Sequence, residues 1–308
     1  MSERDRIMVA VDGGEGGRAA VRYAAGRTRR SGAELWLVHV VDLAVATGRF
    51  YPYGYTGLAE QVRAAGATVL AHAAKEAAEI VGAEQVTSTL LDGGVVTELV
   101  HAAADSAMVV LGDERRHGLA RIVTGSVTGR VASRAPVPVV VVPADWPVER
   151  DARTVVVAVA DCDASTELVV RALGEAVDRD GGLVIVHSWE VPPVYYESTL
   201  GQLDAAGVLA DARHRLMQTL ERARQLVPNS AEVDAWIEVH RGQPAQIVTE
   251  ASKDAALLVI GRRGHAFPLR RLGGTGHALL RESRCPVEVV PPSPESAEGS
   301  PADYEAAG

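Results

Sequence analysis

The chain has 308 residues, enough for two domains of ordinary size; 47% of them are hydrophobic and only 4% are aromatic. Its formal net charge of −9 argues against nucleic acid or an anionic membrane surface as a partner, because both need a basic face. With no apolar run near the ~18 residues of a membrane span, no signal-peptide core and only two cysteines, we expect a soluble cytoplasmic protein without disulfides or a metal centre.

The first half predicts strands that alternate with helices. Residues 7–11 form an unbroken apolar run, which is typical of a strand buried on both faces of a parallel sheet. In chain order we expect strands at 7–11, 35–41, 86–91, 107–111 and 137–143, and helices at 18–30, 58–81, 95–105 and 125–134.

The second half repeats this order. His39 corresponds to His187 (187 − 39 = 148) and Gly112 to Gly261 (261 − 112 = 149). The repeated strands are expected at 154–160, 183–188, 233–239, 256–260 and 286–290, with a long helix near 203–227. Such alternation predicts an α/β fold: two open parallel sheets with right-handed crossovers and helices on both faces.

The predicted domain boundaries follow from the repeat. One domain occupies residues 1–146 and the other residues 152–292, joined by a linker around 145–151. The tail, 293–308, is rich in Pro, Ser, Ala and Glu, and we expect it to be disordered.

A glycine-punctuated loop follows the fourth strand of the second half. Its spacing is Gly-x2-Gly-x9-Gly-Thr, formed by Gly261, Gly264 and the pair Gly274-Thr275. Glycines let the backbone turn tightly and approach a ligand, and a helix that starts at Gly274 would offer free N–H groups and a positive dipole end to an anion. The loop therefore predicts a phosphate site. In the alternative interpretation, the glycines are only turn and cap residues.

Both halves resemble the universal stress protein family, whose ATP-binding members carry Gly-x2-Gly-x9-Gly-[Ser/Thr] in this location. The resemblance is to the tandem form and covers nearly the whole chain apart from the linker and the tail. It implies five-stranded sheets of order 3-2-1-4-5, with the ligand where strands one and four lie side by side. It also implies that segment 138–143 meets 286–291 within one chain, and that two such chains form a further homodimer.

Neither half keeps the whole family pattern. The acidic residue expected after strand one is Asp12 in the first half, whereas a gapless alignment gives Ala160 in the second, with Asp161 one position later. The first half has Arg115 in place of the middle glycine, which would crowd a phosphate. We therefore expect the better ATP site in the second half.

The predicted nucleotide-binding residues come from both halves. They are Gly261, Arg262, Arg263, Gly264, Gly274, Thr275, Ser188 and Asp161 in the second half, and Asp12, Gly13, Val40, Gly112, Gly125 and Ser126 in the first. We expect Arg262 and Arg263 to contact phosphates, with solvated loop charges as the alternative. Asp12 is expected at the ribose or adenine, with a turn role as the alternative.

The predicted function is that of a stress-response nucleotide sensor that binds ATP, with or without Mg²⁺, as a regulatory ligand. We assign no catalytic residue, because the sequence has no Walker A motif and no Ser-His-Asp order. His39 and His187 are expected to be core histidines bonded to backbone. Two other functions stay open: a slow ATPase or nucleotide-dependent transferase, and a nucleotide-free interaction protein with decayed sites.

Overall fold

The structure is a computed structural model that describes residues 6–43, 56–113, 127–147, 152–190, 205–262 and 272–292. The tail and four predicted site residues lie outside these ranges: Gly125, Ser126, Arg263 and Gly264. Within the described ranges, no helix is both long and apolar enough to cross a bilayer, and no group of acidic, histidine or cysteine side chains is arranged to hold a metal ion.

Strands and helices alternate through both halves, which confirms the predicted α/β fold. The first half contains β1 (Arg6–Ala10), α1 (Glu15–Ser31), β2 (Glu34–Val41), α3 (Thr56–Val81), the 3-10 helix η2 (Ala83–Gln85), β3 (Val86–Asp92), α4 (Val95–Ala103), β4 (Met108–Asp113), α5 (Val127–Arg134) and β5 (Val139–Pro143). The second contains β6 (Val155–Val159), α6 (Thr166–Val177), β7 (Leu183–Trp189), α7 (Ala205–Leu226), η6 (Ser230–Glu232), β8 (Ala235–Arg241), α8 (Pro244–Ala251), β9 (Leu257–Gly261), α9 (Gly274–Glu282) and β10 (Val287–Val290).

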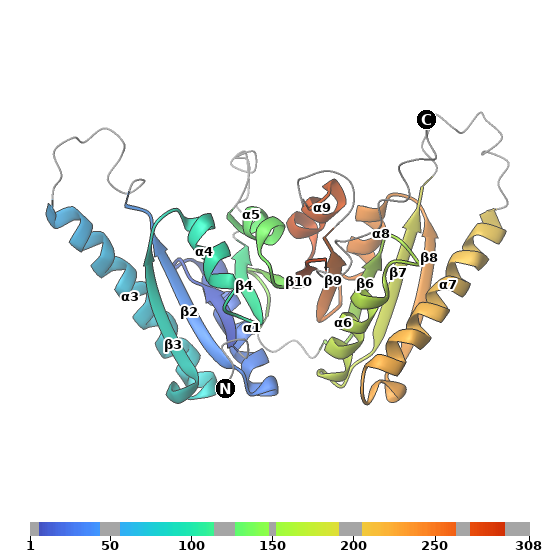
Figure 1. Cartoon of the computed structure of the whole chain (residues 1–308), viewed down its shortest axis with the longest axis horizontal. Helices are drawn as coiled ribbons and strands as arrows, with labels where there is room; N and C mark the ends of the chain where they lie inside the picture. Colours follow the sequence, from blue (N-terminus) through green and yellow to red (C-terminus); the bar gives the residue numbers. More distant parts are fainter. Residues whose placement is uncertain are drawn as a thin grey trace.

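The strand order within each half agrees with the expected 3-2-1-4-5. The halves run β3-β2-β1-β4-β5 and β8-β7-β6-β9-β10, with all neighbours parallel. The structure differs from two separate sheets in one respect, because β5 and β10 pair antiparallel and join them into a ten-stranded sheet. Pairing removes two valine-rich edges that would otherwise be open to other chains. Figure 1 shows the two halves side by side, with α3 and α7 on the outer flanks.

The core lies on both faces of this joined sheet, because neighbouring strand residues point to opposite faces. In β1, Val9 belongs to the cluster that contains Leu70 of α3, whereas Met8 belongs to the cluster that contains Leu99 of α4. Each cluster continues through the second half. The helices are thereby fixed against the strands, and the strand ends that carry the predicted site are held in register.

Candidate functional site

The carboxyl ends of three neighbouring strands bring predicted site residues of the second half to one edge. Asp161 follows β6, Ser188 lies near the end of β7, and Gly261 ends β9. The registers Val159↔His187 and Ala158↔Ile260 align these ends. The same alignment in the first half collects Asp12, Val40 and Gly112. Both edges lie where the strand order reverses, the position at which open α/β sheets bind ligands.

The N-terminus of α9, the helix that follows β9 in the chain, is exposed to solvent. The helix begins at Gly274 as the sequence predicts, and its N-cap, Gly273, has no side chain to cap it. The first-turn amides of a helix have no intrahelical acceptor. Gly274 and Thr275 are exposed, and a Cβ added at Gly273 or Gly274 would meet no described heavy atom within 4 Å. The helix end therefore offers exposed donors and a positive dipole end to an anion.

The first motif glycine has a different role in each half. A Cβ added at Gly112 would lie 2.1 Å from the carbonyl carbon and oxygen of Gly16, so this glycine is required by close packing against α1. At Gly261 the nearest atom would be a methyl of Leu168 at 3.5 Å, which is an ordinary contact. Packing thus explains the glycine of the first half but not that of the second.

A small cavity lies between α1 and α3 in the first half. Its volume is about 170 Å³, and Val11 and Gly13 line it. Gly13 has φ +84°, a left-handed conformation that favours glycine, and a Cβ there would lie 3.3 Å from Val69. Pockets for drug-sized ligands have volumes of roughly 300–1,000 Å³. This cavity alone is therefore too small for a whole nucleotide.

Asp12 and Asp161 occupy equivalent turns. Asp12 Oδ1 accepts a hydrogen bond from the Gly14 N–H at 2.9 Å, and Asp161 Oδ1 accepts one from the Asp163 N–H, also at 2.9 Å. Asp161 thus makes the same turn hydrogen bond as Asp12, one position after Ala160, the residue that the gapless alignment gives. Both side chains fulfil the turn role, while their contact with a ribose stays a prediction.

Arg262 lies in the interface between the halves. Its side chain is buried, and Nη1 donates to the carbonyl oxygens of Ala135 at 2.9 Å and Ala132 at 3.3 Å. These carbonyls belong to the C-terminal end of α5, where the helix dipole attracts a cation. The sequence left two roles open for Arg262, a phosphate contact or a solvated loop charge; burial of the side chain excludes the solvated charge and gives it a structural partner far away in the sequence.

His39 and His187 confirm the prediction of backbone-bonded histidines. Nδ1 of His39 is 2.6 Å from the Val11 carbonyl oxygen, and Nδ1 of His187 is 2.9 Å from that of Val159. Because a carbonyl oxygen only accepts, each Nδ1 donates the proton. The two rings therefore tie the second strand of each half to the end of the first.

Sequence reasoning missed a buried charge cluster between the halves. Glu175 of α6, 1% exposed, forms ion pairs with Arg27 of α1 and with Arg171 and Arg179. Burial alone would raise the pKa of the Glu175 carboxyl, but the guanidinium groups, led by Arg27, lower it to about 2. Arg171 also binds Glu288 of β10, whose pKa is raised by burial. The i, i+4 spacing of Arg171, Glu175 and Arg179 was the available signal.

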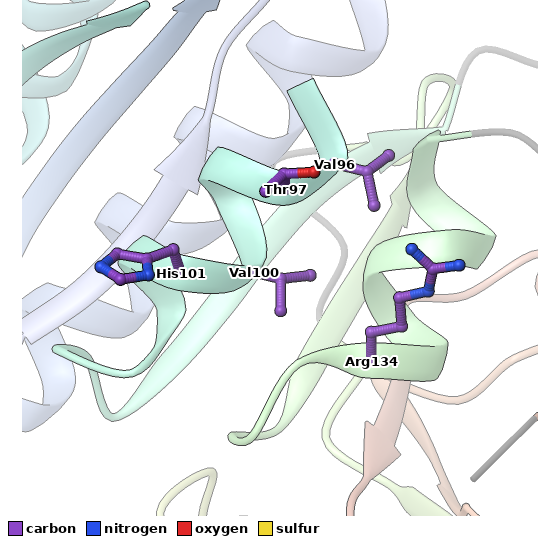
Figure 2. A pocket seen from close by; sticks show the side chains of 5 residues that line it. All are labelled: Val96, Thr97, Val100, His101 and Arg134. Carbon is purple, nitrogen blue, oxygen red and sulfur yellow. The ribbon is translucent and has the colours of Figure 1, made fainter. Parts of the chain in front are cut away.

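A further cavity of about 310 Å³ lies between α4 and α5. Figure 2 shows Val96 and Val100 of α4 facing Arg134 of α5, while His101 points away from Arg134. None of the predicted nucleotide-binding residues lines this cavity. It is therefore separate from the candidate site at the strand ends.

The comparisons with known proteins cover both halves. The family model described as the universal stress protein family matches residues 3–143 and 152–291. The chain is 31% identical over 291 residues to universal stress protein Rv2005c of Mycobacterium tuberculosis (strain ATCC 25618 / H37Rv), covering 92% of this chain and 96% of the relative. It is 29% identical over 295 residues to a universal stress protein of Mycolicibacterium smegmatis, covering 93% and 97%.

The fold is also shared with a solved structure. The crystal structure of a universal stress protein from Archaeoglobus fulgidus DSM 4304 has a TM-score of 0.70 at 18% identity, covering 96% of this chain and 99% of that one. Its likeness shows the fold, while the family model matches each half separately. The chain therefore belongs to the universal stress protein family, in its tandem form.

Proposed function

We propose that this protein binds ATP at the carboxyl edge of its second half and acts as a regulatory nucleotide sensor. One observation carries the proposal: α9 has an exposed N-terminus with no side-chain cap, and it is the helix that follows β9, the strand at the reversal of strand order. Backbone amides around Gly274 and Thr275 would bind the phosphates. Gly261 and the loop residues Arg263 and Gly264 would lie along them, and Ser188 and Asp161 would contact the adenine and ribose.

The first half is proposed to bind nucleotide weakly or not at all. Gly112 packs closely against Gly16 of α1, and Arg115 stands where the motif has its middle glycine. Asp12, Gly13, Val40, Gly125 and Ser126 would complete any residual site. Rapid phosphoryl transfer is not part of the proposal, because the chain lacks the lysine cradle that such catalysis uses.

The first test asks whether the protein carries nucleotide at all. Freshly purified protein is denatured by heat, and the released small molecules are separated and quantified by ultraviolet absorbance and mass spectrometry. We expect adenine nucleotide at up to one equivalent per chain. If the extract is empty and added ATP produces no heat in calorimetry, with or without Mg²⁺, the proposal is wrong.

The second test uses a substitution whose effects on folding and binding have opposite signs. Gly274→Glu places a carboxylate in the first turn of α9, where it favours the helix by about 0.3–1 kcal/mol, yet it would repel the phosphates. We expect an unchanged or higher melting temperature and at least tenfold weaker ATP binding by calorimetry. Gly57→Glu is the matched control, because Gly57 lies in the first turn of α3 with no described heavy atom within 4 Å of its added Cβ. Equal affinities in the two variants would contradict the site.

We also propose that the β5–β10 pairing persists in solution. Small-angle X-ray scattering should then give one compact particle per chain, with no population of separated halves. A homodimer of such chains, which the sequence analysis also raised, is testable by sedimentation at several concentrations. A radius of gyration larger than that of the joined chain, at every protein concentration, would contradict persistent pairing.

A further inference from the structure

The two halves are related by a pseudo-two-fold axis, because residues that face each other at the centre of their interface are separated by the length of the sequence repeat. In the β5–β10 seam, Val140 lies opposite Glu288, and these positions are 148 residues apart. The cross-half pair Arg27–Glu175 has the same separation of 148 residues. On a two-fold axis, each residue faces its own counterpart. If two copies of the first half met through this surface, Arg27 would therefore face a second Arg27.

The Arg27–Glu175 ion pair is shielded from solvent, and two hydrogen bonds fix its orientation. Nη2 of Arg27 donates to Oε1 of Glu175 at 2.6 Å, and Nη1 binds the other carboxylate oxygen. The side chains are 12% and 1% exposed. Arg179 adds a second link across the seam, donating from Nη2 to the Tyr23 hydroxyl at 3.1 Å. A bidentate arginine–carboxylate pair fixes both distance and orientation, so the two helices are held in one register.

We propose that Arg27 and Glu175 determine which surfaces can pair: the first half docks onto a second half and rejects a copy of itself. The partner that fits the surface around Arg27 is the surface of the second half that carries Glu175. In a pair of first halves, two guanidinium groups would meet in a desolvated contact without a carboxylate between them, and like charges are strongly unfavourable there. Repulsion of the wrong pairing is thus built into the same residue that attracts the correct one.

A cysteine on the axis would report the wrong pairing. In full-length chains whose two native cysteines are replaced, Val140→Cys sets one thiol opposite Glu288; two paired first halves would set two thiols opposite each other. Glu175→Arg separates the first half from the second half of the same chain, and small-angle X-ray scattering would verify this as an increase in the radius of gyration. With Arg27 in place or as Arg27→Lys, we expect only background disulfide dimer after mild oxidation. With Arg27→Met, we expect at least a fivefold increase. Equal dimer in all three chains, whether high or absent, would overturn the proposal.

A second measurement does not depend on releasing the interface. Urea unfolding of the full chain is compared for Arg27→Met, Glu175→Gln and the double variant. If the two residues form one pairing unit, removing Arg27 relieves the uncompensated charge left by Glu175→Gln, and the double variant unfolds at a higher urea midpoint than Glu175→Gln alone. A double variant at or below that midpoint, with the two losses simply adding, would overturn the proposed coupling.

Discussion

Replacement of Glu175 by glutamine should strongly destabilise the protein, although the two side chains have nearly the same size and shape. Glu175 is the shared anion for Arg27, Arg171 and Arg179, and its side chain is almost fully buried. Glutamine keeps the size and some hydrogen bonds, but it leaves three guanidinium groups close together. Arg171 retains Glu288 at 2.7 Å, so Arg27 and Arg179 carry most of the uncompensated charge.

The expected loss follows from what such clusters cost when one partner is removed. Breaking a buried ion pair from one side costs about 3–5 kcal/mol, because the remaining charge stays desolvated. For a chain of this size, roughly 2–4 °C of melting temperature is lost per kcal/mol. We therefore expect Glu175→Gln to lower the melting temperature by on the order of 10 °C at neutral pH.

The matched control is Glu76→Gln, which removes the same group from the Arg22–Glu76 pair. That pair joins α1 to α3 inside the first half, with a separation of 3.0 Å and side chains 29% and 28% exposed. Pairs that reach solvent contribute only about 0–1 kcal/mol. Urea unfolding at neutral pH, followed by fluorescence and circular dichroism, measures both variants. Losses that agree within about 1 kcal/mol would refute the reasoning, because burial would then make no difference.

Four further predictions concern pH, the interface and the strand ends. Because the pKa of Glu175 is lowered to about 2, its contribution is present above the ordinary carboxyl pKa and lost as pH falls through about 2; acid titration of urea stability should show this in wild type and not in Glu175→Gln. Burial raises the pKa of Glu288, so wild type should lose stability as pH rises towards that pKa, and Glu288→Gln should remove this dependence. Arg262→Met should cost about 2 kcal/mol in urea unfolding and leave ATP affinity within about threefold by calorimetry; a tenfold loss would return Arg262 to the phosphate site. Gly112→Ala should cost about 1–3 kcal/mol because its Cβ meets backbone, whereas Gly261→Ala should cost less than about 1 kcal/mol, and the reverse order would contradict the packing argument.

The fold was predictable because its signals are local. The predicted strands agree with the observed ones to within about two residues at each end, as in 256–260 for the observed β9, Leu257–Gly261. The start of α9 at Gly274 was also predicted. The sequence analysis expected segments 138–143 and 286–291 to meet, and β5 and β10 do pair there; the single joined sheet follows from that contact.

The side-chain environment of the candidate site was less predictable because it depends on distant partners. Arg262 stands beside the motif glycine in sequence, yet its hydrogen bonds go to carbonyls 127 and 130 positions away. Asp161 was named from the sequence one position after the aligned Ala160, but only the structure shows that it makes the same turn hydrogen bond as Asp12. The partners of Arg262 belong to the other half, so they become visible only when the two halves are placed against each other.

The covalent link between Pro143 and Val155 gives the seam a property that a two-chain dimer lacks. A short tether keeps its two ends at an effective concentration in the millimolar range, whatever the amount of protein in the cell. A low concentration of the protein would therefore leave the joined sheet intact, because the same two halves always remain linked.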